Sequence, residues 1–188
     1  MRRASSPGGS DGERHSCDEV DQLVAAWRRE RPDADVSPLE ILSRVSRLAR
    51  HLDRVRKRAF ASQQLEQWSF DVLAALRRAG APYQLTPGTL LQRTLVTSGA
   101  MTNRLDRLEA AGLVSRRQDA ADRRGVIVKL TADGKRRVDK CLTELLVSEE
   151  ELISGLSDRD REALAGLLRR LLAPLDARLR STSSPAPG

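Results

Sequence analysis

One stretch, residues 86–130, constrains the fold of this chain more than any other part of it. It opens with Thr86 and Pro87, a helix start in which the hydroxyl can cap the first turn and the proline ring fixes φ where no amide donor is needed. A second helix follows, and Gly112 supplies the left-handed residue that commonly ends a helix. Residues 113–130 then place two short β-favouring runs around a charged loop, which predicts a hairpin. Helix, turn, helix and hairpin in this order is the pattern of a winged helix-turn-helix.

The second helix of this stretch, which Thr97 and Ser98 can cap, divides into two faces. At about 100° per residue, one face carries the apolar residues Met101, Leu105 and Leu108. The opposite face carries Gly99, Asn103, Asp106 and Arg107. The second helix of such a motif enters the DNA major groove, where amide and guanidinium groups can match adenine and guanine edges.

An ordinary amphipathic surface helix would show the same two faces. The hairpin loop favours DNA binding, because it carries Arg123 and Arg124 beside Asp119 and Asp122. The predicted contacts with double-stranded DNA are Ser98, Thr102, Asn103, Arg107, Arg123 and Arg124.

Charge and composition agree with a polyanionic partner. The 188 residues carry a formal net charge of +7, with 39% hydrophobic and 31% charged residues, a balance typical of a soluble globular chain. No apolar run approaches the length of about 18 residues that a membrane span needs. Arg2 and Arg3 lead into Ser, Pro and Gly instead of a signal sequence, so we expect a cytoplasmic protein with no membrane association.

Neither metal nor catalytic chemistry is indicated. Cys17 and Cys141 are far apart and lack a CxxC or Cys/His neighbourhood, and His15 and His51 are isolated. No nucleophile elbow, phosphate loop or carboxylate pair is present, so we expect no enzyme, no metal site and no cofactor. A redox-sensing cysteine remains an alternative.

The rest of the chain is predicted to be helical, with mobile tails. Residues 1–16 and 181–188 are too poor in apolar residues to order themselves. Ser37 is predicted to cap a long helix that has proline at its first position. Apolar residues on this helix and on residues 131–180 exceed what one small winged domain can cover, which predicts a homodimer whose two reading helices match a palindromic operator.

The run TSGAMTNRLDRLEAAGLVSRR, followed by DAADRRGVIVKLTADGK, resembles the MarR family of dimeric bacterial transcription regulators. The resemblance covers about residues 38–179, and the wing signature corresponds to Asp122, Arg124, Leu130 and Thr131. It implies a mainly α fold and a wing arginine, Arg124, in the minor groove. The implied single domain spans 17–180, with an extra amino-terminal helix (17–31), dimerisation helices (38–62 and 131–180) and the winged helix-turn-helix (66–130).

An added amino-terminal helix bearing a tryptophan is similar to the branch of the family that responds to urate. The resemblance implies a ligand site formed by Trp27, Asp71, Arg104 and Arg116, and a repressor that urate or a related purine metabolite releases from its operator. A related branch answers to aconitate and citrate, which are also small anions that suit two arginines.

The residues themselves add evidence on two of these positions. Arg104 lies only about 60° from the apolar axis of its helix, so it points toward the body of the protein and could hold an anion or pair with Asp71. Asp71 has Trp68 and alanines three and four places away, where an unpaired carboxylate is costly. Alternatively, Asp71 lies in the first helical turn, where the helix dipole favours an anion.

Three classes of function remain open from the sequence. The first is a DNA-binding regulator that responds to a metabolite, with urate, aconitate and citrate as the candidate ligands. The second is a regulator switched by oxidation of Cys17 or Cys141. The third is a helical interaction protein that binds no DNA, which Asn103, Arg107 and Arg124 disfavour.

Overall fold

The computed structural model describes residues 17–94, 98–119 and 125–182, with only the backbone described at 98 and 179–182. The chain forms two compact units, residues 1–51 and 52–188. The predicted tail 1–16 lies outside the described residues, as does most of the predicted tail 181–188. The last helix continues to Thr182, two residues beyond the predicted end of the folded region.

The first unit contains α1 (Glu19–Glu30) and the first half of α2 (Ser37–Ser62). Asp18 caps α1 by accepting hydrogen bonds from the amides of Val20 and Asp21 at 2.8 and 2.9 Å. Arg44 of α2 reaches both carboxylates, lying 2.9 Å from Asp18 and 2.6 Å from Asp21. Buried Val20 and Val24 complete the contact, so ion pairs and apolar packing hold α1 against the first half of α2.

The predicted cap at Ser37 is wrong in detail. Ser37 is already the first helical residue of α2, and its amide donates to Asp35 at 3.0 Å. The carboxylate two residues earlier satisfies the amide that the helix leaves unpaired, which is the task that the sequence pattern assigned to the serine hydroxyl.

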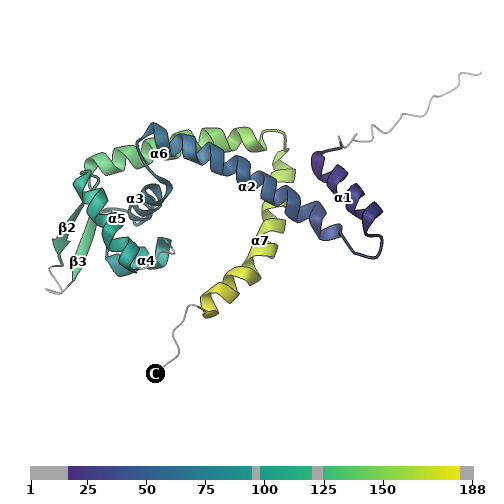
Figure 1. Ribbon diagram of the computed structural model, residues 1–188. Helices are drawn as coiled ribbons and strands as arrows, with labels where there is room; N and C mark the ends of the chain where they lie inside the picture. The colour runs from purple at the N-terminus through teal and green to yellow at the C-terminus, as the bar shows by residue number, and fades with distance from the viewer. Residues whose placement is uncertain (1–16, 95–97, 120–124, 183–188) are drawn as a thin grey trace, which may run out of the picture. The chain divides into compact units, whose positions relative to one another are not determined.

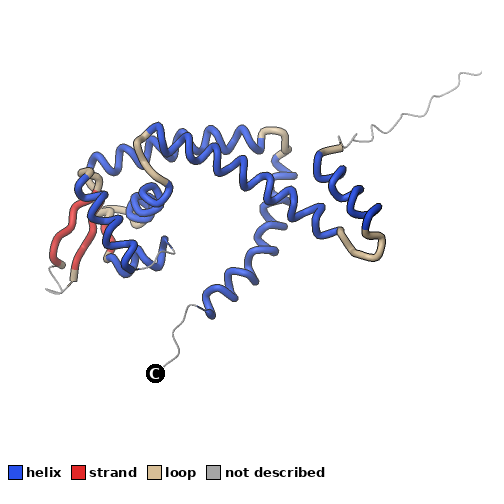
Figure 2. Tube along the Cα trace, viewed as in Figure 1, coloured by secondary structure: helices blue, strands red, loops and turns tan. Residues whose placement is uncertain are grey.

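The second unit holds the winged helix-turn-helix, and Figures 1 and 2 show its elements. In chain order after α2 they are α3 (Gln67–Arg78), β1 (Gln84–Leu85), α4 (Pro87–Thr94), α5 (Ser98–Ala110), β2 (Val114–Gln118), β3 (Val126–Leu130), α6 (Ala132–Ile153) and α7 (Asp158–Thr182). The strands form an antiparallel sheet in the order β1-β3-β2, with Val114 opposite Leu130. The mainly α, winged helix-turn-helix prediction is confirmed.

Local sequence signals account for the starts of α4 and α6 and for the end of α5. The amide of Thr89 donates to the Thr86 hydroxyl at 3.2 Å, which is the predicted cap of α4. Gly112 has φ +72 and directs the chain from α5 into β2, a conformation that costs glycine little. Thr131 caps α6, since its hydroxyl accepts from the amide of Gly134 at 3.0 Å.

One apolar cluster holds this unit together, and α5 is part of it. Met101, Leu105 and Leu108 of α5 are 1–2% exposed, as the helical wheel predicted. They pack in the same cluster as buried residues of α3, α4, the sheet and α6, namely Val72, Leu73, Ala75, Leu76, Leu90, Leu113, Val114, Val128, Leu130, Val138 and Cys141.

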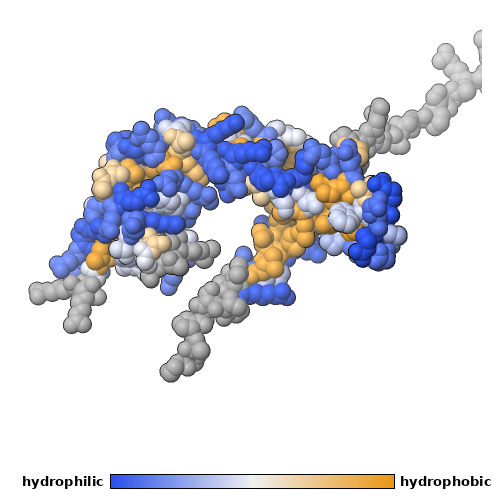
Figure 3. Space-filling model, viewed as in Figure 1, coloured by the Kyte–Doolittle hydropathy of each residue, from blue (hydrophilic) through white to orange (hydrophobic). Residues whose placement is uncertain are grey.

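Large apolar side chains remain exposed on the long helices. On α2 these are Ile41, Leu42, Val45 and Leu48, on α6 Leu142, Leu146 and Val147, and on α7 Leu164, Leu167, Leu171, Leu172 and Leu175. Figure 3 shows the apolar surface along α7. Continuous apolar faces of this kind mark contact sites in soluble proteins. No helix in the described parts of the chain is long and apolar enough to cross a membrane.

Gly134 has a structural role that the sequence pattern does not reveal. A Cβ at this position would lie 2.1 Å from the Leu113 carbonyl oxygen and 3.0 Å from Leu130 Cδ1. The absence of a side chain therefore lets the first turn of α6 sit directly against the end of the α5–β2 turn.

We predict that Gly134→Ala destabilises the protein by about 1–3 kcal/mol or more, because the backbone oxygen cannot move aside cheaply. Urea unfolding followed by circular dichroism measures the change. Gly166→Ala on α7 is the control, since its added Cβ has nothing within 4 Å and a mid-helix alanine should stabilise by up to about 1 kcal/mol. Equal effects of the two substitutions would contradict this role of Gly134.

Candidate nucleic-acid interface

The outward face of α5 presents the side chains that could meet DNA. Thr102, Asn103 and Arg107 are exposed, whereas Arg104 is only partly exposed at the edge of the packed face. Both observations match the faces expected from the helical wheel. The side chain of Ser98 and the wing residues Arg123 and Arg124 lie outside the described residues.

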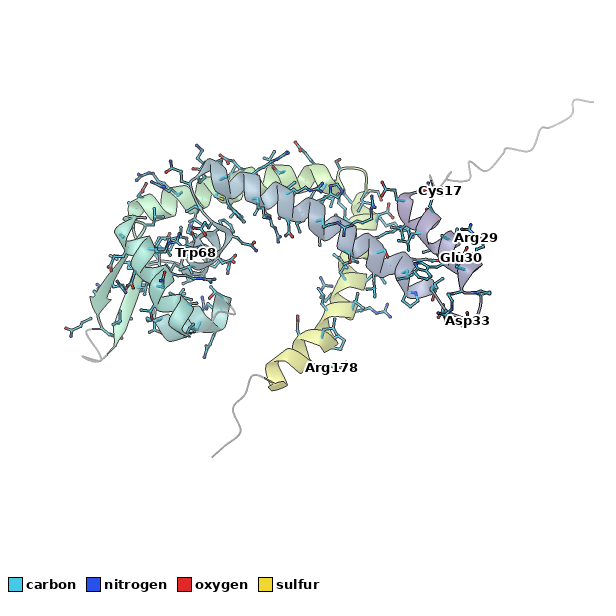
Figure 4. The ribbon with its side chains drawn as sticks, viewed as in Figure 1. Cys17, Arg29, Glu30, Asp33, Trp68 and Arg178 are labelled. Atoms are coloured by element: carbon cyan, nitrogen blue, oxygen red, sulfur yellow. The ribbon has the colours of Figure 1, made fainter. Side chains whose placement is uncertain are left out.

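Arg107 is held by Trp68 of α3 and by Glu66, the residue before α3, which the sequence analysis did not select as contacts of Arg107. Its guanidinium lies over the Trp68 ring, 4.7 Å from the centroid, and its Nη2 pairs with Glu66. Trp68 Nε1 donates to the other Glu66 oxygen at 2.7 Å. Figure 4 shows the labelled Trp68 among the side chains of α3 and α5. Glu66 lies 41 residues from Arg107 in sequence, so no local pattern could have linked them.

The surroundings of the Asp71 carboxyl act on its pKa in opposite directions. Partial desolvation raises the pKa of Asp71, while the positive charges of Arg78, Arg104 and Arg56 act in the opposite direction. Within the described chain Asp71 forms no ion pair, and Arg104 lies over Trp68 at 5.5 Å. Because α3 begins at Gln67, Asp71 lies in the second turn, and the first-turn alternative was wrong.

Arg116 forms a clamp between strand β2 and helix α5. Its guanidinium contacts Asp106 at 2.7 Å and Glu109 at 2.6 Å, and its backbone amide donates to Glu109 at 2.8 Å. The Arg116 side chain and amide hold the pKa of Glu109 below its usual range, so both charges are present at neutral pH. The resemblance implied that Arg116 binds a ligand, whereas in this structure its guanidinium pairs with two carboxylates of α5.

The four predicted ligand residues divide between the two units. Asp71, Arg104 and Arg116 belong to residues 52–188, and all three lie on elements of the winged helix-turn-helix. Trp27 lies on α1 in residues 1–51, where its side chain is 48% exposed.

Comparison with known proteins identifies the family. A family model described as MarR family matches residues 63–125. The transcriptional regulator PecS of Dickeya dadantii is 36% identical over 153 residues, which cover 81% of this chain and 92% of PecS. This chain belongs to the MarR family.

Solved structures of MarR-family proteins have the same fold. A cysteine-to-serine variant of MarR from Escherichia coli, complexed with operator DNA, has 30% identity and a TM-score of 0.61, covering 74% of this chain and 99% of that chain. Bordetella bronchiseptica BpsR, whose DNA binding is regulated by 6-hydroxynicotinic acid, has 26% identity and a TM-score of 0.57, covering 70% of this chain and 91% of that chain. The predictions of a DNA-binding transcription regulator and of a non-enzymatic protein are confirmed.

The two cysteines of this MarR-family chain differ in their surroundings. Cys141 is buried in α6, where its thiol donates to the Ala59 carbonyl at 3.5 Å. Burial, together with the charge of Glu144, raises the pKa of Cys141 to about 11. Cys17 is exposed next to the start of α1 (Figure 4). In the described part of the chain, no group of three or more Cys, His, Asp or Glu side chains could hold a metal ion.

We predict that iodoacetamide at about pH 8 modifies Cys17 and leaves Cys141 thiol intact in the folded protein, because alkylation requires the thiolate. Intact-protein mass spectrometry should show a single adduct, and Cys17→Ser should show none until urea is added. Rapid modification of Cys141 in the native Cys17→Ser variant would revive the redox-switch alternative.

Proposed function

We propose that this protein is a homodimeric repressor that binds a palindromic operator through α5 and the wing, and that urate or a related purine metabolite releases it. The observation that carries the proposal is the division of α5. Its apolar face is locked into the core, while Asn103, Thr102 and Arg107 face outward in a fold shared with an operator-bound MarR. Asn103 and Arg107 have donor groups that suit adenine and guanine edges.

The exposed apolar faces support the homodimer. Beyond Leu145, neither α6 nor α7 contributes a buried residue to the core of this unit in the part of the chain that the structure describes. A second copy of the chain offers identical faces, and a two-fold axis would place two α5 helices about 34 Å apart, one turn of DNA.

The arginines near α5 support an anionic ligand. Arg104 and Arg116 lie on the two elements that a ligand must influence in order to change DNA binding, the reading helix and the first wing strand. Urate is a monoanion near neutral pH and could pair with both guanidinium groups. The regulation of BpsR by 6-hydroxynicotinic acid shows that a small aromatic acid can control a relative. Aconitate or citrate is the alternative ligand class for the same two arginines.

The Arg116 clamp suggests how the ligand would act. An anion that binds Arg116 must displace Asp106 and Glu109, which are both on α5. Loss of these pairs would detach one edge of the reading helix from the wing strand.

The DNA part of the proposal predicts opposite signatures for two substitutions. Asn103→Ala should cost about 1–3 kcal/mol on the operator and little on unrelated DNA, since it removes a base contact. Arg124→Ala should weaken both DNAs by similar factors and reduce the salt slope by about one, as expected for a wing charge in the minor groove. Fluorescence anisotropy with both duplexes at several salt concentrations measures this. Equal losses on both duplexes for Asn103→Ala would place Asn103 away from the bases.

The ligand part predicts that Arg116→Ala abolishes release by urate. Because the substitution also removes the two ion pairs with α5, it should weaken operator binding without urate by up to about 2 kcal/mol. Arg117→Ala is the matched control on the same strand and should respond as the wild type does, because Arg117 donates to Gln84 at 2.8 Å and not to a carboxylate of α5. Glu109→Gln should lower the urate concentration needed for release, since the anion then displaces a neutral group. Coupling of this kind is about 1–3 kcal/mol and reciprocal, so operator DNA should weaken urate binding equally.

Gel shifts with urate, xanthine, aconitate and citrate decide between the ligands. Release by aconitate or citrate and not by urate would reject the ligand assignment and leave the repressor intact. A Trp27→Phe and an Arg116→Ala variant that both respond to urate normally would show that the ligand binds elsewhere.

A further inference from the structure

The amino-terminal end of α3 forms a rigid platform under Arg107. Glu66 precedes α3 in an extended conformation, and its amide donates to the hydroxyl of buried Ser69 at 3.3 Å. Its carbonyl accepts from the amide of Phe70 at 3.0 Å. The Glu66 backbone is therefore held by the helix that lies deepest in the core, and its side chain starts from a fixed point.

Both Glu66 oxygens are used within the platform. One accepts from the Trp68 indole at 2.7 Å, and the other pairs with Arg107 Nη2. The Trp68 bond and Arg107 lower the pKa of Glu66, so the carboxylate remains charged at neutral pH. The indole plane supports the guanidinium from below while the carboxylate fixes its rotation in that plane.

The platform leaves part of Arg107 available. A guanidinium has five N–H donors in a planar fork, and the interactions described here engage Nη2 and the flat face. The side chain is 57% exposed, so the remaining edge is open to solvent. A guanine presents O6 and N7, which suit two parallel donors from such an edge.

We propose that Glu66 and Trp68 are positioning residues for base recognition, which orient the Arg107 guanidinium before DNA arrives. This inference rests on the proposed role of Arg107 in reading bases. A flexible arginine loses rotamer freedom when it binds, and a side chain that is already ordered loses less, so preorganisation strengthens the specific complex.

The opposing explanation is that the Glu66–Arg107 pair holds Arg107 away from DNA. The free energy of this pair is too small for that. The Glu66–Arg107 pair is exposed on both sides, and a pair of this kind changes an equilibrium by at most about fivefold. One good base contact discriminates by about 5- to 150-fold. DNA would therefore overcome the pair easily. Arg104 over the same indole adds a second positive charge, so the platform attracts phosphate in spite of Glu66.

The experiment compares the affinity of each variant for two duplexes, one selected by the wild type from random-sequence DNA and a scrambled duplex of the same length. Glu66→Gln keeps the size and an acceptor for Trp68 but removes the charge. We expect its ratio of specific to non-specific affinity to fall by about two- to fivefold, with non-specific affinity unchanged or slightly higher. Glu151→Gln removes an equal charge from exposed α6 and should leave the ratio unchanged.

A double-mutant cycle separates positioning from a structural role. In an Arg107→Ala background, Glu66→Gln should no longer change the ratio, because Glu66 acts through Arg107. Trp68→Phe, which keeps a ring face and removes the N–H donor, should produce a smaller fall than Glu66→Gln. Urea unfolding shows whether each variant retains its fold.

The outcomes are distinct. A higher ratio for Glu66→Gln would identify a competitor of DNA, and an unchanged ratio would show that the platform is irrelevant to recognition; either overturns the inference while base reading by Arg107 stands. If Arg107→Ala leaves the ratio of specific to non-specific affinity unchanged, Arg107 does not read bases. That result would reject both the proposed role of Arg107 and this inference.

Discussion

The packing of α5 against α3 is the contact on which the rest of the winged helix-turn-helix depends. Met101, Leu105 and Leu108 enter the same apolar cluster as Leu73 and Leu76 of α3, and all are 0–2% exposed. Burying a side chain of this size stabilises by about 1.5–3 kcal/mol, more than any exposed ion pair in the molecule can contribute. The apolar face thereby fixes the rotation of α5 about its own axis, and the polar face is exposed as a consequence. The DNA-reading role that we propose for this polar face therefore depends on which residues of α5 are buried.

Polar contacts then fix what apolar packing leaves adjustable. On one edge of α5, Arg107 contacts Trp68 of α3 and Glu66, which precedes α3. On another edge, Asp106 and Glu109 contact Arg116 of β2. These pairs are exposed or partly exposed and individually weak, so they set side-chain orientation and the fit of helix to wing more than they add to global stability. Their weakness suits a regulator, because contacts that must rearrange when a ligand or DNA binds cannot be deeply buried.

The sequence predicted the features that depend on local signals, such as the cap at Thr86, the left-handed Gly112, the hairpin and the two faces of α5. It could not supply features that join distant positions. Gly134 is needed because the Leu113 carbonyl lies above it, and nothing in residues 132–138 reveals that neighbour. Glu66 reads as the start of a helix, and its pairing with Arg107 depends on the crossing of α3 and α5. Ser37 shows the opposite failure, where a strong local signal gave way to Asp35, a competitor two residues away.

DNA and the proposed small anion would both act on α5. The free energies of its ion pairs are large enough to couple the binding of the two. An anion at Arg116 would exchange two ion pairs for its own, and two exposed or half-exposed pairs are together worth up to about 2 kcal/mol. Allosteric coupling between ligand and DNA is typically about 1–3 kcal/mol. No rearrangement of the core is therefore required: the apolar face of α5 can remain packed while the edge facing β2 is released. Because the apolar face of α5 is buried and only weak ion pairs hold its edges, α5 can change its affinity for DNA while the fold stays unchanged.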